Sequence, residues 1–191
     1  MLLHHSAHAE ATFQLFGGMG DGSSSAWSGG GQVLSFAPEK RIELQRKIVA
    51  FDRDMAPGSI LVQTAERRLY YVLPGGQAEM FPIGVGREGF TWSGRNTITR
   101  KAEWPDWRPP ANMIRREADR GHFIPAHMPG GPNNPLGARA LYIGDTEFRI
   151  HGTTQPWSIG RAVSSGCIRM LNDHVIDLYD KVQVGAEVVV E

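Results

Sequence analysis

Short runs of β-branched, aromatic and other apolar residues follow one another from residue 59 to the end of the chain. Turn-forming residues separate several of these runs, as Pro74-Gly75-Gly76 and Gly144-Asp145 do. Runs of about four to eight such residues between turn signals are typical of strands. The pattern therefore predicts an antiparallel, mainly β domain, with strands in residues 59–64, 67–73, 78–85, 140–144, 147–152 and 186–190.

Two segments have the spacing of helices instead. In residues 39–50, apolar residues recur among charged ones at a spacing compatible with a short helix. Residues 172–182 begin with Asn172 and Asp173, either of which can cap a helix N-terminus. The apolar positions of this second segment share one helical stripe, which consists of Val175, Leu178, Tyr179 and Val182. We expect residues 172–182 to be the one clear helix.

Other segments follow neither pattern. Residues 17–34 are rich in Gly and Ser and bury too little apolar surface to offset the entropy of ordering, so we expect residues 1–34 to be disordered. Pro57-Gly58 marks a boundary between an N-terminal extension, 1–56, and a folded domain, 57–191. Residues 103–137 are rich in Pro, Trp and Gly and too long for a hairpin loop, which is typical of a lid or a binding wall.

Charge and hydropathy exclude some partners. The 191 residues include 20 Lys plus Arg and 20 Asp plus Glu, so no net charge attracts nucleic acid or an anionic membrane. No apolar run approaches the ~18 residues that a membrane-spanning helix needs. The start, MLLHHSAHAEA, places Ala7-His8-Ala9 before Glu10, as at a signal-peptidase site behind a truncated apolar region. Export of the protein behind a truncated signal peptide and an arbitrary start of the chain explain this N-terminal sequence equally well.

The single cysteine, Cys167, lies in the stretch SSGCIRM, so any thiol chemistry belongs to it. Upstream, strand alternation puts Phe148 and Ile150 on one face and His151 on the polar face, at the end of the strand. The 16 positions from His151 to Cys167 allow the chain to loop out and return a neighbouring strand beside the histidine. A histidine-paired thiol has a pKa of roughly 3.5 to 7.5 instead of about 8.5, so such a pair predicts a reactive thiolate.

Two neighbouring features fit a nucleophile. Ser165, Gly166 and Cys167 can aim successive backbone N–H groups at one point, where they stabilise the charge formed when a thiolate adds to a carbonyl. Arg169 lies on the same side as Cys167 if the strand continues, and can hold a carboxylate. The alternatives are a space-filling cysteine, a structural histidine and a surface arginine. A turn of Ser and Gly before Cys167 and a nearby histidine together favour the interpretation of Cys167 as a nucleophile.

Other motifs are weaker. Residues 84–89 match G-x-G-x-x-G, but Phe-Thr-Trp-Ser-Gly follows instead of the helix that a dinucleotide site requires. The histidines at positions 4, 5 and 8 lie in the segment expected to be disordered, and His122 and His127 lack a third ligand, so no metal site is expected. Trp104 and Trp107 either wall a substrate groove or pack within the lid.

The tract HGTTQPWSIGRAVSSGCIRM resembles the signature of the L,D-transpeptidase catalytic domain, the YkuD-like family, in which His-Gly or His-Ser precedes Ser-x-Gly-Cys at this distance. ILVQTAERRLYYVLPGG resembles the family's opening hairpin, IGVGREGFTWSG its Gly-rich segment, and GPNNPLGARALYIG the loop and strand before the catalytic histidine. The similarity covers residues 57–191. It implies a mainly β catalytic domain, a β-sandwich or barrel with a lid loop over residues 103–137 and one or two short helices.

The resemblance also implies roles for residues. Cys167 would be the nucleophile and His151 the base, with the imidazole oriented by the Gly152 carbonyl. The amides of Ser165, Gly166 and Cys167 would form the oxyanion hole. Four residues would contact substrate, namely Arg169, Ser164, Trp107 and Asn134. Ser165 departs from the pattern, because many members have histidine there. No metal or other cofactor is implied.

Members of this family act on peptidoglycan stem peptides. The thiolate attacks the carbonyl of a diaminopimelate, expels the terminal D-alanine and leaves a thioester, which an amine of another stem resolves as a 3-3 cross-link. Water, a D-amino acid or an amine of another protein gives other products. The resemblance thus implies an exported, periplasmic enzyme, and we expect a monomer without a nucleic-acid partner. Two alternatives stay open: an L,D-carboxypeptidase or amidase with water as acceptor, and an inactive wall-binding module.

Overall fold

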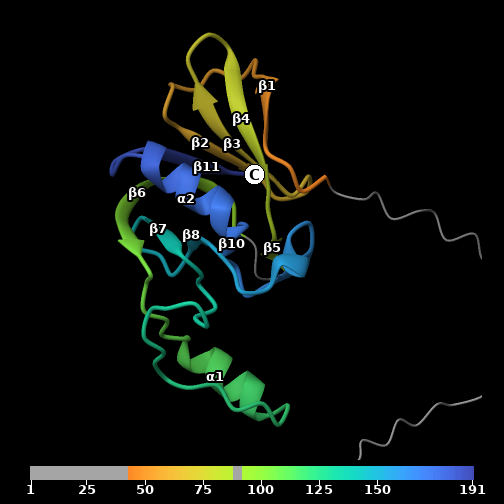
Figure 1. Cartoon of the computed structure of the whole chain (residues 1–191), viewed down its shortest axis with the longest axis vertical. Helices are drawn as coiled ribbons and strands as arrows, with labels where there is room; N and C mark the ends of the chain where they lie inside the picture. The colour runs from red at the N-terminus through yellow and green to blue at the C-terminus, as the bar shows by residue number, and fades with distance from the viewer. Residues whose placement is uncertain (1–42, 88–91) are drawn as a thin grey trace, which may run out of the picture. The chain divides into compact units, whose positions relative to one another are not determined.

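The computed structural model describes residues 43–87 and 92–191 (Figure 1). Within this part of the chain, nine strands form one sheet in the order β1-β4-β3-β2-β11-β6-β7-β8-β10. A second sheet consists of β5 (Val85–Gly86) and β9 (Ala162–Ser164). The strands of the large sheet are β1 (Lys47–Ala50), β2 (Ile60–Gln63), β3 (Arg68–Leu73), β4 (Gln77–Pro82), β6 (Gly94–Glu103), β7 (Arg139–Ile143), β8 (Arg149–His151), β10 (Ile168–Arg169) and β11 (Glu187–Val190). The predicted mainly β fold is confirmed.

The pairing is not purely antiparallel, as the sequence had suggested. β11 pairs in parallel with β2, β10 with β8 and β5 with β9. The helix α2 (Asn172–Lys181) connects β10 to β11 and returns the last strand to the middle of the sheet, between β2 and β6. Crossover connections of this kind produce parallel neighbours, whereas hairpins cannot.

The helix predicted in residues 39–50 is wrong over the part that the structure describes. Residues 39–42 lie outside it, and Lys47–Ala50 form β1, which pairs antiparallel with β4 from Lys47 opposite Met80 to Ala50 opposite Gln77. Ile48 and Val49 are β-branched, which suits a strand, and the backbone groups at the edge of β4 offer β1 a partner.

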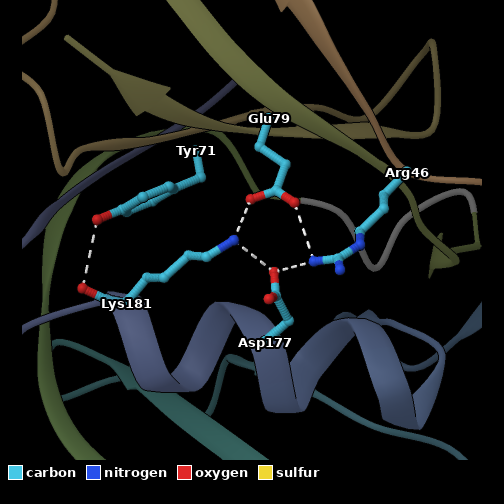
Figure 2. Close-up of polar contacts among 5 residues, drawn as sticks. All are labelled: Arg46, Tyr71, Glu79, Asp177 and Lys181. Atoms are coloured by element: carbon cyan, nitrogen blue, oxygen red, sulfur yellow. Dashed lines mark hydrogen bonds and ion pairs between the residues drawn. The ribbon is translucent and has the colours of Figure 1, made fainter.

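A cluster of charged side chains joins the segment before β1 to the domain, and we call it the Glu79 cluster. Figure 2 shows the buried Glu79 carboxylate of β4 between Arg46 and Lys181, whose nitrogens lie 3.0 and 2.5 Å from its oxygens. Both cations also contact Asp177 of α2, and the Tyr71 hydroxyl donates to the Lys181 carbonyl at 3.3 Å. Residues 46–50 are therefore part of the folded unit.

The described residues form two α-helices, which lie in different parts of the domain, and a short 3-10 helix at Pro156–Ser158. The predicted helix α2 is present and packs on β7 and β8, with Val175 and Leu178 in the core (Figure 1). Its N-cap is Leu171, so Asn172 is its first residue. The helix α1 (Ala111–Ala118) lies in the predicted lid, away from the sheet (Figure 1). Neither is long and apolar enough to cross a membrane.

Several predictions concern residues 1–42, which lie outside the described part. They include the disorder of residues 1–34, the Gly/Ser-rich segment 17–34, the signal-peptidase pattern and the histidines at positions 4, 5 and 8. These stay predictions.

Candidate active site

Parallel pairing of β8 with β10 brings the candidate histidine and cysteine together. Arg169 lies opposite His151 in this register, and the Met170 amide donates to the His151 carbonyl at 2.8 Å. Cys167 directly precedes β10, and both His151 and Cys167 line one cavity of about 560 Å³. The chain thus loops out after His151 and returns beside it, as the spacing had predicted.

His151 is buried and held by its own strand end. Its Nδ1 lies 2.6 Å from the Gly152 carbonyl oxygen. A carbonyl can only accept a hydrogen bond, so Nδ1 carries the proton and Nε2 is the basic nitrogen. Burial lowers the pKa of His151 to about 3, and the positive charge of Arg169 acts in the same direction. The ring is therefore neutral at neutral pH and able to accept a proton.

Asn172, at the start of α2, holds the segment that carries the Gly152 carbonyl. Its Oδ1 accepts hydrogen bonds from the amides of Ala138 (3.1 Å) and Thr153 (3.2 Å), and its Nδ2 donates to the Thr153 carbonyl at 3.1 Å. A Cβ on Gly152 would lie 2.2 Å from Asn172 Oδ1, so only glycine fits there. Sequence reasoning treated Asn172 as a helix cap and missed this contact, because the three segments meet only in the folded chain.

The turn before the nucleophile is fixed from within. The buried Ser164 hydroxyl donates to the Cys167 carbonyl at 2.6 Å and accepts from the Gly166 amide at 3.2 Å. Gly166 has a φ of 115°, in the region that favours glycine. Ser164 therefore shapes this turn as well as lining the cavity. The Gly166 amide already has an acceptor, which differs from its expected place in an oxyanion hole.

The thiol of Cys167 is protonated rather than ion-paired. Burial raises the pKa of this thiol above its ordinary value, against the opposing positive charge of Arg149. Its Sγ donates a weak hydrogen bond to the Glu147 carbonyl oxygen at 3.7 Å. The expectation of a lowered thiol pKa is therefore wrong for this state, because a neutral His151 supplies no positive charge to stabilise a thiolate.

Arg169 follows Cys167 on β10 and lines the same cavity. Its backbone exchanges two hydrogen bonds of 2.8 Å with Gly84, and its guanidinium donates to Gln155 Oε1 at 3.1 Å. A Cβ on Gly84 would lie 2.6 Å from the Ser158 carbonyl oxygen, so this glycine allows close packing beside the site.

The described part of the G-x-G-x-x-G pattern has no helix. Gly84 and Gly86 lie in extended structure, and residues 88 and 89 are outside the described part.

Residues 103–137, the predicted lid, contribute one wall of the cavity. The Trp104 amide donates to the Ala138 carbonyl at 2.8 Å across the base of the lid, and Trp107 and Met128 exchange two backbone bonds of 2.9 Å. Trp107 lines the cavity, whereas Trp104 lines a separate hollow with Arg100 and Tyr142. The predicted contact of Trp107 with substrate stays a prediction.

The predicted substrate contact of Asn134 stays a prediction, and the structure gives this residue a different setting. Asn134 is buried and is not among the residues that line the cavity. Its Nδ2 donates to the carbonyls of Met128 and Pro129, and its Oδ1 accepts from the Leu136 amide. It holds the lid loop together instead.

The described lining of the cavity carries more positive than negative charge. It includes four arginines and two glutamates, namely Arg87, Arg116, Arg149, Arg169, Glu117 and Glu147. Arg116, on α1, was not singled out in the sequence; its Nη2 donates to the Ser165 hydroxyl at 3.1 Å. Such a lining suits a ligand with carboxylates.

No group of three His, Cys, Asp or Glu that could hold a metal ion occurs among residues 43–87 and 92–191. His122 pairs with Glu117 at 3.2 Å and His127 with Asp106 at 3.1 Å, both on the surface of the lid.

Comparisons with known proteins identify the family of this chain. The model of the YkuD family, described as L,D-transpeptidase catalytic domain, matches residues 57–190. The probable L,D-transpeptidase ErfK/SrfK of Escherichia coli strain K12 is 45% identical over 139 residues, which are 71% of this chain and 44% of that protein. The chain thus spans less than half the length of this curated relative.

Two solved structures extend the comparison. L,D-transpeptidase 3 from Mycobacterium tuberculosis, in complex with a faropenem-derived adduct, shares the fold at 16% identity, with a TM-score of 0.52 over 70% of this chain and 59% of that chain. A protein from Brucella melitensis, named a probable carnitine operon oxidoreductase, is 43% identical, with a TM-score of 0.52 over 78% of this chain and 95% of that chain. The latter name concerns that protein alone. The family model covers most of this chain and agrees with the name of its curated relative, so the chain belongs to the L,D-transpeptidase catalytic domain family.

Proposed function

We propose that this chain is a cysteine L,D-transpeptidase that acts on peptidoglycan stem tetrapeptides. The observation that carries the proposal is the pairing of β8 with β10, which sets a neutral, buried His151 and the Cys167 thiol on one positively charged cavity. A transpeptidase of this kind needs a base, a nucleophile and a place for the substrate carboxylates. No metal or other cofactor enters the proposed reaction.

In the first step, the thiol leaves the Glu147 carbonyl and gives its proton to Nε2 of His151 as sulfur attacks the carbonyl of the third stem residue. The free enzyme holds both groups neutral, so the proton moves during the attack and not before it. General-base help of this kind contributes about 10²- to 10⁴-fold in rate. Arg149 and Arg169 favour the negative charge that develops on sulfur, since both already oppose the raised pKa of the thiol.

The tetrahedral oxyanion then takes hydrogen bonds from the amides of Ser165 and Cys167, because the Gly166 amide is engaged by Ser164. One such donor contributes about 10²- to 10³-fold in rate. Collapse of the intermediate forms a thioester on Cys167, breaks the peptide bond and releases D-alanine, whose amine receives the proton from His151. An amine of a second stem attacks the thioester and gives a proton to His151. As the C–S bond breaks and the new amide forms, His151 passes this proton to the sulfur and the thiol is restored.

The acceptor and the compartment are part of the proposal. A second stem as acceptor gives a 3-3 cross-link, and an amine of a wall-anchored protein or a D-amino acid gives other products. Water as acceptor makes the chain an L,D-carboxypeptidase, which is the second candidate. The substrate lies outside the inner membrane, so we place the enzyme in the periplasm. Retention of Cys167, His151 and Gly166 in one site speaks against an inactive wall-binding module.

Intact-mass analysis with a carbapenem tests the activated thiol. We expect one covalent adduct on the wild-type protein and none on Cys167→Ala, with Asp180→Ala, on the exposed side of α2, as a control variant that keeps the nucleophile. A wild-type protein that stays unmodified would overturn the proposal. Disaccharide-tetrapeptide with excess acceptor stem then separates transfer from hydrolysis, because tripeptide without cross-linked product would indicate the carboxypeptidase.

A further inference from the structure

A second hollow lies beside the cavity that contains Cys167, and no step of the proposed reaction takes place in it. Its volume is about 380 Å³, and its described lining includes Arg100, Trp104, Tyr142 and Arg149. Arg149 also lines the cavity of the nucleophile, so the two spaces are neighbours that share one side chain. A ligand bound at Cys167 can therefore extend into this second space, which we call the Trp104 hollow.

Strand register builds the floor of the Trp104 hollow. Arg100 of β6 lies opposite Tyr142 of β7, and Tyr142 lies opposite Arg149 of β8, so the three residues form a row on one face of the sheet. The guanidinium carbon of Arg100 lies 3.5 Å from the centre of the Tyr142 ring, and that of Arg149 lies 5.5 Å from it. His151 follows Arg149 by two positions on β8 and faces the same side. The hollow and the catalytic base therefore share one face of the sheet.

Trp104 forms a wall of this hollow in an unusual backbone conformation. Its φ of 40° is one of two positive values among the described non-glycine residues, and such a conformation is strained. The Trp104 amide donates to the Ala138 carbonyl at 2.8 Å, and a Cβ on Gly130 would lie 1.8 Å from the Trp104 carbonyl oxygen. Backbone contacts thus hold Trp104 in place, although the residue stays 45% exposed. An indole held in this way offers a flat apolar face to a ligand.

The polar groups beside the indole suit a neutral ligand. The carboxylates of Glu103 and Asp106 line the hollow together with the guanidinium groups of Arg100 and Arg108. Each carboxylate is paired at 3.1 Å with a basic side chain outside the lining. Hydrogen-bond donors and acceptors next to an aromatic face suit a ring with several hydroxyl and amide groups, whereas an anion would meet the two carboxylates.

We propose that the Trp104 hollow binds an N-acetylated sugar ring of the glycan strand that carries the donor stem peptide. The ring stacks on the indole of Trp104, and its hydroxyl and acetamido groups form hydrogen bonds with the arginines and carboxylates of the lining. Two stem residues separate the sugar from the residue that is attacked, a span of about 7 Å or more, so the sugar needs a separate site next to the cavity. The inference rests on the proposed function, because it adds a subsite for the same donor.

Donors with and without the sugar test this assignment. Wild type, Trp104→Gly, Trp104→Phe and the control Trp157→Ala are each given disaccharide-tetrapeptide or free tetrapeptide, and kcat/KM is measured for release of D-alanine. Glycine adopts a positive φ without strain, so Trp104→Gly removes the indole without straining the base of the lid. Trp157 is 57% exposed and lines neither the cavity nor the hollow, so its variant removes an indole elsewhere on the surface.

The measured quantity is the ratio of kcat/KM for the two donors. Stacking on an indole together with hydrogen bonds predicts that wild type prefers the disaccharide donor about tenfold. We expect this preference to fall to about twofold or less in Trp104→Gly, because the stacking surface is lost. It should be intermediate in Trp104→Phe, which keeps a smaller ring, and unchanged in Trp157→Ala.

The outcomes distinguish the two proposals. If wild type releases D-alanine from neither donor, the proposed function fails. If wild type turns over both donors without preference, or if Trp104→Gly keeps the wild-type preference by slowing equally on both, the sugar subsite is overturned and the proposed function stands.

Oligosaccharide binding provides a test that needs no turnover. Tri-N-acetylglucosamine is titrated into wild type, Trp104→Gly and Trp157→Ala, and binding is followed by saturation-transfer NMR, which detects weak complexes. We expect binding to wild type and Trp157→Ala, and about fivefold or weaker affinity in Trp104→Gly. Equal binding to wild type and Trp104→Gly, or no binding to wild type, would contradict the sugar subsite.

Discussion

Replacement of Asn172 by alanine tests the link between the fold and the candidate site. Asn172 makes three hydrogen bonds, to the amides of Ala138 and Thr153 and to the Thr153 carbonyl. Ala138 and Thr153 are only 1% and 3% exposed, so water does not readily replace the lost partner. Each buried polar group left without a partner costs about 1–3 kcal/mol, and partial relaxation brings the expected total for Asn172→Ala to about 2–4 kcal/mol.

The loss is measured by thermal and urea unfolding. For a domain of this size, about 1 kcal/mol corresponds to roughly 2–4 °C in Tm, so we expect Asn172→Ala to melt roughly 5–12 °C below wild type. The same variant loosens the segment that carries the Gly152 carbonyl, which orients His151. We therefore expect acylation of Cys167 by a carbapenem to slow by about tenfold or more at a temperature where the variant is folded.

Two control variants sharpen the result. Asn172→Asp keeps the acceptor oxygen for both amides and loses only the Nδ2 donor, so we expect a smaller loss of about 1 kcal/mol. Asp180→Ala, on the exposed side of the same helix, should melt like wild type. If Asn172→Ala melted within about 2 °C of wild type and reacted at the wild-type rate, the three hydrogen bonds would not support the site and the reasoning would be refuted.

Three further predictions concern pH, the Glu79 cluster and the lid. The pKa of His151 is about 3 when folded and about 6.5 when unfolded, so the stability that depends on its neutral form is present above about pH 6.5 and is lost as the pH falls toward 3. Urea titrations should therefore give a flatter dependence of unfolding free energy on pH for His151→Asn, and equal slopes would contradict this. Glu79→Ala should lower the free energy of unfolding by about 1–2 kcal/mol in urea, because its two cations are half-exposed, whereas Glu43→Ala, which breaks an exposed pair with Lys47, should match wild type. Gly130→Ala places a Cβ 1.8 Å from the Trp104 carbonyl oxygen, so it should distort the base of the lid and slow carbapenem acylation; an unchanged rate would show that the lid wall does not depend on this contact.

Residue type and periodicity along the chain explain which helices and strands were predicted correctly and which were missed. The strands β2, β3 and β11 and the helix α2 combine suitable residues with a clear period, and each lies where the sequence placed it. The strand β6 was missed because only Ile98 among its ten residues is buried, and the rest is largely polar. Its pairing with β7 and β11 holds it in the sheet. Residues 47–50 also owe their strand to a partner, the edge of β4, and not to their own helical spacing.

By itself, the sequence determined the strand-rich fold, the helix α2 and the return of the chain that places His151 and Cys167 on one cavity, because these depend on local period and on the spacing between motifs. Tertiary structure alone decided the protonation states of that pair, since burial and the charges of Arg149 and Arg169 set both pKa values. It also decided that Asn172 supports Gly152, that Asn134 faces the lid loop and that Arg116 meets Ser165. Each of these contacts joins side chains to groups whose positions follow only from how the strands, the helix α2 and the lid pack together, and periodicity along the chain carries no information about that packing.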